Sequence, residues 1–213
     1  MAILDADVAG HAGWPLVDLA KACLNGGARL LQVRAKHASG GAFLDMAAAV
    51  AAVAREAGVA VLVNDRADIA RLAGAGGVHV GQEDLGPAAV RAILGRDAIV
   101  GISTHTPAQL AAAVAAPVSY VAIGPVFATG TKATGYAALG LERVRAAAED
   151  ARARGLPLVA IGGITLENAP QVLRAGAASV AVIGDLLRTS DPECRVREFM
   201  QRIVGSDGPM ASD

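Results

Sequence analysis

Polar and charged side chains stand within or directly after several short apolar segments of this sequence. The first such group is Gln32, Arg34 and Lys36, at alternate positions. Alternate side chains of a β-strand point to one face of the sheet, so a strand here would place the three together. A guanidinium offers paired donors and an ammonium a point charge, and both suit phosphate oxygens. The spacing therefore favours an anion site, but it is also compatible with two cations that reach solvent between helices.

Two carboxylates follow the next two apolar segments. Asn64 and Asp65 end the segment VLVND, and Asp84 lies three residues beyond the segment GVHVG. Two carboxylates with few other protein ligands are typical of a magnesium ion that keeps its waters and binds substrate phosphate. A zinc site is not expected, because no His or Cys cluster accompanies them. Asp65 has a second interpretation, as the cap of the helix that follows it.

Three further polar residues near these segments have simpler interpretations. His79 lies inside a strand and is expected to be a hydrogen-bonded structural histidine. Asp68 falls in the first turn of a helix, where an exposed carboxylate complements the helix dipole. Ser103 ends the fifth apolar segment and could contact a substrate or belong to a helix-capping turn. No Gly-x-Ser-x-Gly sequence surrounds it, which argues against a serine nucleophile.

A loop of small polar residues follows the sixth apolar segment and predicts a second phosphate site. It contains Thr129, Gly130, Thr131 and Lys132. Hydroxyls, backbone N–H groups and one cation together can cradle a phosphate. The residues that follow, 133–139, are small and could act as a mobile lid over a bound substrate.

These residues are spaced along a chain in which short apolar segments alternate with longer amphipathic ones. We predict strands at Ala2–Asp7, Arg29–Lys36, Ala60–Asp65, Gly77–Gly81, Ala98–Ser103, Tyr120–Phe127, Leu158–Gly163 and Ser179–Gly184. Their Val, Ile and Leu content is typical of parallel strands covered on both faces. Pro87 and Pro107 stand where a first helical residue is expected, with Thr106 as an N-cap. Glycines that suit left-handed C-caps follow five helical segments, at Gly26, Gly58, Gly95, Gly155 and Gly176.

Eight β-then-α units in a chain of 213 residues favour an α/β fold of one domain, a (β/α)8 TIM barrel, over an open doubly wound sheet. We expect the barrel to span residues 1–205 and the small, polar residues 206–213 to form a disordered tail. Such barrels bind substrates at the carboxyl ends of their strands, and the loops after strands seven and eight often hold a phosphate. Gly163 and Gly184 end those two strands, where glycine permits close approach of the backbone.

The composition restricts the class of ligand and the setting of the protein. Aromatic residues make up 3% of the chain and the formal net charge is −1, so neither base stacking nor a general attraction to nucleic acid or membrane is expected. Cys23 and Cys194 match no metal-ligand spacing and are expected to be buried free thiols. No signal-peptide pattern and no unbroken apolar span are found, so we expect a cytoplasmic protein.

Seven segments, in this order, resemble the thiamine-phosphate synthase family: QVRAK, VNDRADIA, GVHVGQEDL, GIS, GPVFATGTK, IGGI and AVIG. The resemblance implies a transferase of thiamine biosynthesis. Such an enzyme condenses 4-amino-5-hydroxymethyl-2-methylpyrimidine diphosphate with 4-methyl-5-(2-phosphoethyl)thiazole, giving thiamine phosphate and diphosphate. The family's reaction is dissociative: diphosphate leaves first, and the thiazole nitrogen then captures the pyrimidinylmethyl cation. This course needs no protein nucleophile, and the sequence offers no convincing nucleophile–base pair.

The resemblance also implies a role for each matching residue. Gln32, Arg34, Lys36 and Asn64 would bind the pyrimidine diphosphate, with further contacts from Ser103 and Lys132. Of these, Arg34, Lys36, Ser103 and Lys132 would be the catalytic groups that stabilise the leaving diphosphate. Thr129, Gly130, Thr131, Gly163, Ile183 and Gly184 would hold the thiazole phosphate. Asp65 and Asp84 would hold Mg²⁺, so activity should require the metal and Asp65→Ala should abolish it.

Some positions depart from the family, and two alternative functions stay open. Ala35 stands where many relatives have glutamate, and Gly184 where they usually have serine. A thiazole tautomerase would share the fold but carry a histidine directly after the sixth-strand glycine, where this chain has Pro125. A non-catalytic barrel that binds a phosphate ligand would lack the carboxylates or the cations. Only small-molecule partners are expected, in a chain that could form a homodimer.

Overall fold

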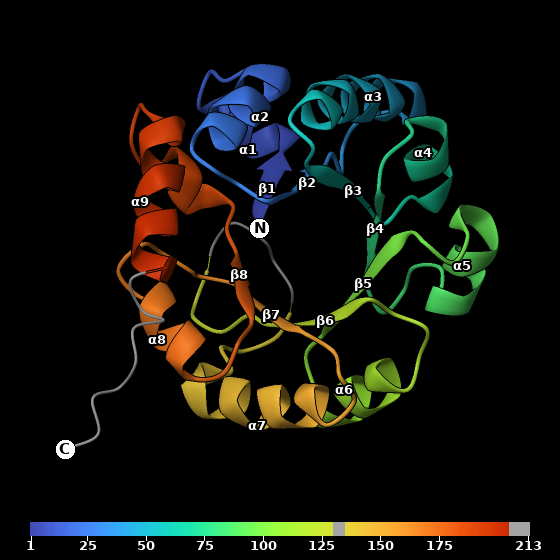
Figure 1. Cartoon of the computed structure of the whole chain (residues 1–213), viewed down its shortest axis with the longest axis vertical. Helices are drawn as coiled ribbons and strands as arrows, with labels where there is room; N and C mark the ends of the chain where they lie inside the picture. Colours follow the sequence, from blue (N-terminus) through green and yellow to red (C-terminus); the bar gives the residue numbers. More distant parts are fainter. Residues whose placement is uncertain (130–134, 205–213) are drawn as a thin grey trace.

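The computed structural model describes residues 1–129 and 135–204 and forms a closed barrel of eight parallel strands, in the order β1 to β8 (Figure 1). The strands are β1 (Ala2–Asp5), β2 (Leu30–Arg34), β3 (Ala60–Asn64), β4 (Gly77–Val80), β5 (Ile99–Thr104), β6 (Tyr120–Ile123), β7 (Leu158–Ile161) and β8 (Ser179–Ala181). The barrel closes between its first and last strands, because Ile3 N donates to Val182 O at 2.9 Å. The predicted (β/α)8 fold is thus confirmed, and the open sheet is excluded.

Helices surround the strands as an outer ring (Figure 1). They are α1 (Ala6–His11), α2 (Leu16–Asn25), α3 (Gly40–Glu56), α4 (Ala67–Leu72), α5 (Pro87–Leu94), α6 (Pro107–Val114), α7 (Gly140–Arg152), α8 (Ala169–Arg174), the 3-10 helix η1 (Gly184–Leu187) and α9 (Pro192–Val204). Pro87 and Pro107 begin their helices as predicted. The Thr106 hydroxyl accepts from Gln109 N at 3.2 Å, and the Gln109 side chain accepts from Thr106 N, so α6 starts with a complete capping box.

Several predicted boundaries are wrong, mostly at the carboxyl ends of the strands. β1 stops at Asp5 because the carboxylate of Asp5 accepts from Val8 N at 3.0 Å and starts α1. β2, β6 and β8 also end earlier than predicted, where the chain turns into the loops at the barrel rim. Gly26 is not a left-handed cap, since its φ is −69°; Gly27 takes that conformation instead, with φ +97°. The predicted tail lies outside the described residues.

Strand alternation separates two apolar layers. The buried apolar side chains inside the barrel are those of Ile3, Leu62, Tyr120, Ala122, Val159 and Ala181. The intervening residues of each strand, such as Leu4 and Val63, pack outward against the helices in a larger cluster. Gln32 is in register with Ile3 on one side and with Leu62 on the other. Because paired residues of neighbouring strands point to the same face, Gln32 and Arg34 face the inside of the barrel.

One glycine is required for the filling of the barrel interior. A Cβ on Gly101 would lie 2.1 Å from Cζ of Tyr120, on the neighbouring strand. The missing side chain at position 101 therefore makes room for the Tyr120 ring, which is buried. The ring can then extend across the interior to His79 on β4.

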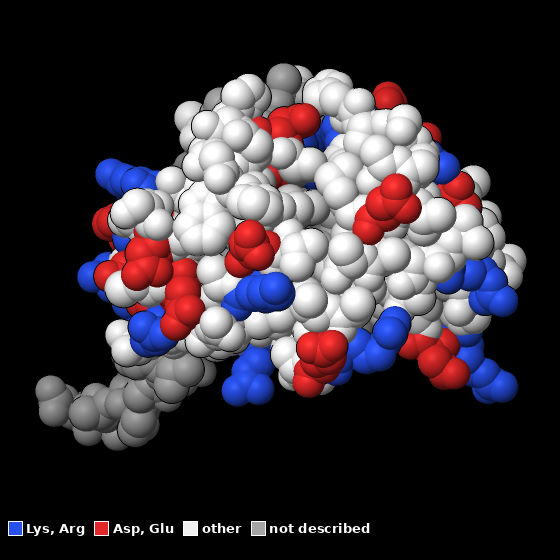
Figure 2. Space-filling model, turned by 90° about the horizontal axis from the view of Figure 1, so that it is seen from above, with Lys and Arg blue, Asp and Glu red and all other residues white. Residues whose placement is uncertain are grey.

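The outer surface carries no large region of one charge in the view of Figure 2, where acidic and basic side chains are interspersed. This distribution agrees with the small net charge of −1. Both cysteines are free, as predicted, but only Cys23 is buried; Cys194 is exposed on the outer face of α9. Within the described ranges, no helix is both long and apolar enough to cross a membrane.

Candidate functional site

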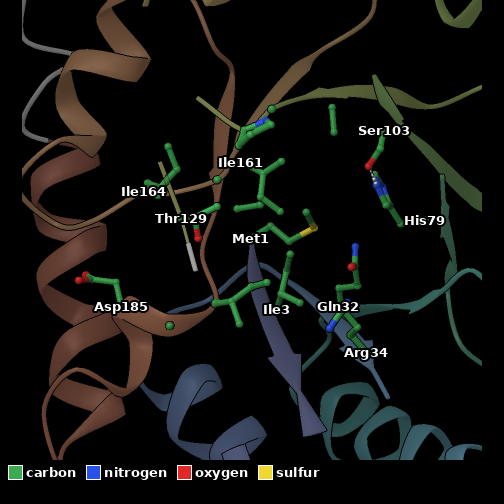
Figure 3. A pocket seen from close by; sticks show the side chains of 18 of the residues that line it. Met1, Ile3, Gln32, Arg34, His79, Ser103, Thr129, Ile161, Ile164 and Asp185 are labelled. Atoms are coloured by element: carbon green, nitrogen blue, oxygen red, sulfur yellow. Dashed lines mark hydrogen bonds between the residues drawn. The ribbon is translucent and has the colours of Figure 1, made fainter. Parts of the chain in front are cut away.

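A cavity of about 430 Å³ opens at the carboxyl ends of the strands (Figure 3). Eight residues predicted for the site line it: Gln32, Arg34, Asn64, Ser103, Thr129, Gly163, Ile183 and Gly184. They come from six of the eight strands or from the loops that follow them, so the fold gathers residues more than 150 positions apart. Gly130, Thr131 and Lys132 lie outside the described residues, as do 133 and 134 of the predicted lid.

Arg34 is held inside the barrel mouth by a carboxylate that the sequence analysis did not identify. The Arg34 guanidinium forms an ion pair with Asp5, its partner in register on β1. The side chain of Arg34 is only 13% exposed and that of Asp5 only 2%. The alternative in which Arg34 reaches solvent between the helices is therefore wrong. The pair also explains how a cation can be buried there, since an unpaired one would cost several kcal/mol.

Two buried donors at this end of the cavity have no acceptor in the described part of the chain. They are Nε2 of Gln32 and Nε of Arg34. Both residues line the cavity, and their side chains lie close together in Figure 3. A buried donor without a partner costs about 1–3 kcal/mol. A polar or anionic ligand whose oxygens reached these donors would remove that cost.

Lys36, Asp65 and Asp84 form a charged cluster beside the cavity, at the rim of the barrel. The Lys36 ammonium forms an ion pair with Asp65. Burial is the main cause that raises the pKa of Asp65; the Lys36 hydrogen bond opposes it, and the neighbouring Asp84 carboxyl adds to the rise. The structure thus places the two carboxylates together, as predicted from their adjacent strands. Asp84 also accepts from Gly81 N at 2.7 Å, which fixes its loop.

Asp65 does not cap the helix that follows. The N-cap of α4 is Arg66, which makes no capping hydrogen bond through its side chain. Asp65 instead has φ +65°, a conformation that a residue with a side chain rarely adopts. Backbone strain of this kind is concentrated at functional sites. Asp68 lies on the surface of α4, as expected, and is paired there with Arg66.

The two rim carboxylates determine which kind of metal ion fits there. No group of three or more His, Cys, Asp or Glu suited to a metal occurs among residues 1–129 and 135–204. Asp65 and Asp84 offer hard oxygen ligands, and the pKa of Asp65 is raised first by burial and then by the neighbouring Asp84 carboxyl. Two carboxylates at a rim fit an ion that keeps several waters and takes other ligands from substrate phosphates. They do not fit a structural zinc site.

A chain of hydrogen bonds crosses the cavity wall from β6 to β4 and β5. Nδ1 of His79 is 2.7 Å from the Tyr120 hydroxyl, and Nε2 is 2.8 Å from Oγ of Ser103. His79 is thus a hydrogen-bonded structural residue, as predicted. Burial raises the pKa of Tyr120, so its phenol stays protonated and can donate to Nδ1. In the tautomer whose Nδ1 accepts from Tyr120, Nε2–H donates to Oγ of Ser103. Ser103 lies in β5 rather than in a capping turn.

The loops after β6, β7 and β8 form the opposite side of the cavity. A Cβ on Gly163 would lie 2.7 Å from Ala128 O, so only glycine allows these two loops to touch. Gly163 also has φ +64°, and its carbonyl accepts from Nδ2 of Asn168 at 2.9 Å. Gly163, Ile183 and Gly184 all line the cavity.

A buried ion pair behind these loops was not predicted. Oδ2 of Asp185 accepts from Leu166 N at 3.1 Å and from Nη2 of Arg195 at 2.7 Å. Asp185 thereby ties the loop after β7 to η1 and to α9. Arg188, at the end of η1, also lines the cavity. A carboxylate directly after the apolar run AVIG was the sequence signal for this pair, but its partner lies on a separate helix.

Two aromatic rings at the mouth were also missed. Tyr136 stacks on His105, with ring centroids 4.1 Å apart, and its hydroxyl accepts from Gln109 at 3.3 Å. Nδ1 of His105 lies 2.5 Å from Gly124 O, and His105 lines the cavity. An imidazole therefore lies close to the end of β6, although the residue after Gly124 is Pro125. The pairing of β5 with β6 brings the His105 ring to this position. The spacing of residues in the sequence did not indicate this contact.

Known proteins of one family match this chain over most of its length. The sequence profile of the family described as thiamine monophosphate synthase matches residues 2–186. A thiamine-phosphate synthase of Koribacter versatilis is 47% identical over 202 residues, which cover 94% of this chain and 93% of that protein. One of Chlorobium luteolum is 41% identical over 184 residues, or 86% of this chain and 85% of that one. The solved thiamine phosphate pyrophosphorylase of Pyrococcus furiosus has a TM-score of 0.86 and 28% identity, and covers 97% of this chain and 96% of its own.

Proposed function

Because the chain belongs to the thiamine monophosphate synthase family, a family of transferases, we propose that it forms thiamine phosphate by a magnesium-dependent dissociative substitution. Its substrates would be hydroxymethylpyrimidine diphosphate and thiazole phosphate. The bond between the pyrimidine methylene carbon and the diphosphate oxygen breaks, and its electron pair leaves with diphosphate. The lone pair of the thiazole nitrogen then forms the new C–N bond.

The observation that carries this proposal is the pair of buried donors without acceptors. Gln32 and Arg34 line a cavity of about 430 Å³, their Nε2 and Nε atoms are buried in its wall, and the cationic rim residue Lys36 lies beside it. A pyrimidine that carries a diphosphate supplies acceptors for both donors and negative charge for both cations. A ligand without acceptors would leave the two donors unsatisfied at a cost of about 1–3 kcal/mol each.

The residues of this chain would act on the leaving group. Arg34 and Lys36 place positive charge where diphosphate develops its own negative charge, in a partly buried site where such interactions are strong. Ser103 would accept a hydrogen bond from Nε2–H of His79 and donate its own hydroxyl proton in a hydrogen bond to the same group. Lys132 is proposed to add a further cation. None of these residues needs to attack the substrate.

The rim carboxylates Asp65 and Asp84 would hold the magnesium ion. When bound, Mg²⁺ supplies charge neutralisation and orientation of the diphosphate. The Lys36 ammonium, now paired with Asp65, could then turn to the diphosphate. The remaining rim loops, with Thr129, Gly130, Thr131, Gly163, Ile183 and Gly184, are proposed to hold the thiazole phosphate through hydroxyl and backbone N–H groups. Binding both substrates in one cavity orients the nitrogen and excludes water.

The test is a direct product assay with purified protein, both substrates and magnesium. Thiamine phosphate would be detected by its oxidation to fluorescent thiochrome. We expect product only when both substrates are present, and none after chelation of divalent ions. Product formation that persists at a native rate with chelator would remove the metal from the proposal.

The two alternative functions give other outcomes in the same experiment. A tautomerase would exchange or move a proton on the thiazole phosphate without the pyrimidine, and His105 near Gly124 O would be the residue to test. A non-catalytic barrel would bind thiazole phosphate but form no product from it. The retention of Arg34, Lys36, Asp65 and Asp84 favours the synthase over both.

A further inference from the structure

The two ends of the cavity each carry one arginine. Of the described residues that line the cavity, Arg34 and Arg188 are the ones with a cationic side chain. Arg34 lies on the side of β2, and Arg188 follows η1, next to Asp185. Figure 3 shows Asp185 on the opposite side of the cavity from Gln32 and Arg34. A cavity with a cation at each end suits a reaction between two substrates that each carry phosphate.

The side chain of Arg188 is only loosely held. It is 63% exposed, and its Nη1 lies 3.7 Å from Oε2 of Glu167 and 3.8 Å from Oδ1 of Asp185. Both distances exceed those of hydrogen bonds. Arg188 therefore keeps its donors for solvent or for a ligand.

Asp185 does not need Arg188 as its partner. Its Oδ2 already accepts from Leu166 N and from Nε and Nη2 of Arg195, at 3.1, 3.1 and 2.7 Å. The Arg195 side chain is 8% exposed and that of Asp185 is 4% exposed, so this pair is fixed inside the protein. The charge of Asp185 is thus largely neutralised by Arg195, which leaves the charge of Arg188 available at the cavity.

We propose that Arg188 binds the phosphate of the monophosphorylated thiazole and so makes the enzyme selective for a phosphomonoester over the corresponding alcohol. The proposal rests on the proposed function and adds a residue to its monophosphate site. Gly163 and Gly184 also line the cavity, and the described chain supplies no acceptor for their backbone N–H groups. Arg188 adds the full positive charge and the planar pair of donors that those groups lack.

A substitution at Glu167 tests whether Arg188 acts on the substrate phosphate or only forms a surface ion pair. Its carboxylate is the other anion near Arg188 and competes with a phosphate for that side chain. If Arg188 binds substrate, removal of Glu167 should leave phosphate binding unchanged or strengthen it. If Arg188 only forms a surface ion pair with Glu167, the two single variants should behave alike.

The experiment measures KM for each substrate in Arg188→Ala, Arg188→Lys and Glu167→Gln, with Arg197→Ala as the matched control. Arg197 is an exposed arginine of α9 that pairs with Glu193 and lies away from the cavity. We expect Arg188→Ala to raise KM for thiazole phosphate about tenfold or more, since a charged hydrogen bond contributes about 1.5–3 kcal/mol. KM for the pyrimidine diphosphate and turnover of the unphosphorylated thiazole alcohol should not change. Arg188→Lys should recover part of the loss, and Glu167→Gln should not raise KM.

Three results would overturn the assignment. They are an unchanged KM for thiazole phosphate in Arg188→Ala, an equal loss with thiazole phosphate and thiazole alcohol, or a parallel rise of KM in Glu167→Gln. Failure of the proposed function would look different, because the native protein would then form no product. In that case calorimetric titration with thiazole phosphate decides: weaker binding by Arg188→Ala than by native protein supports the site, and equal binding rejects it.

Discussion

Asp65 illustrates how a single residue can combine backbone strain, burial and charge. Its φ is +65°, and its backbone N donates to His79 O at 2.8 Å, which holds the strained conformation in place. Its carboxylate is partly buried between Lys36 and Asp84. An arrangement that is unfavourable for an isolated carboxylate becomes favourable when a divalent cation binds the pair.

This balance predicts opposite effects of Asp65→Asn on activity and on stability. The raised pKa means that the folded state disfavours the ionised carboxylate, so stability falls as pH rises through that pKa. At pH about 7 and with chelator, the amide should remove this cost, and Tm should rise by about 2–4 °C for each kcal/mol recovered. Activity with saturating magnesium should fall by about 100-fold or more, because metal stabilisation of the leaving group is worth several kcal/mol.

The control for this prediction is Asp68→Asn, three residues further along the chain. Asp68 is exposed and pairs with Arg66 on the surface of α4, so its loss should change neither activity nor metal dependence. A lower Tm of Asp65→Asn in chelator would contradict the prediction. It would mean that the ion pair with Lys36 stabilises the fold more than the buried charge costs.

At the scale of elements, Asp5 connects the start of α1 to the anion site. One carboxylate oxygen accepts from Val8 N at 3.0 Å and caps the helix, and the other is paired with Arg34. The two functions can be separated by substitution. Serine can cap the helix but carries no charge to pair with Arg34, whereas alanine can neither cap the helix nor pair with Arg34.

We predict that Asp5→Ser and Asp5→Ala both lose activity but differ in stability. Both leave Arg34 without its counter-charge and its fixed orientation, so kcat/KM for the pyrimidine diphosphate should fall by about tenfold or more, as expected for a displaced catalytic group. Asp5→Ala should unfold more readily than Asp5→Ser by about 1 kcal/mol, which is the usual value of an N-cap. Denaturant unfolding and steady-state kinetics of the two variants measure both effects. Equal stabilities, or native kinetics in either variant, would contradict the double role.

The elements themselves could be predicted because each depends on local patterns. Eight apolar runs, first-turn prolines and the Thr106 cap are visible in short windows of sequence. The predicted carboxyl ends of the strands were less accurate, because the residues at the rim make contacts across the barrel that a short window of sequence does not show. The pairs Asp5–Arg34 and Asp185–Arg195 show the limit: each depends on register or helix packing between separate elements. No spacing rule along one segment indicates such partners.

At the scale of the whole molecule, the charges proposed to bind substrate are local rather than part of a general field. The net charge is −1, and Figure 2 shows both signs interspersed on the face in view. The cations of the site are single side chains next to the cavity, paired with or near carboxylates. Attraction of the substrates from a distance should therefore be weak.

We predict only a weak dependence of catalysis on salt. With magnesium held at saturation, kcat/KM for the pyrimidine diphosphate should fall by less than about threefold between about 0.05 and 0.3 M KCl. Salt screens charges beyond about 8–10 Å near 0.1–0.15 M but acts much less on partly buried pairs such as those made by Arg34. Long-range steering would instead change association by about tenfold or more over this range. A decrease of that size, with the thermal stability of the protein unchanged by salt, would mean that an extended basic surface guides the diphosphate into the barrel.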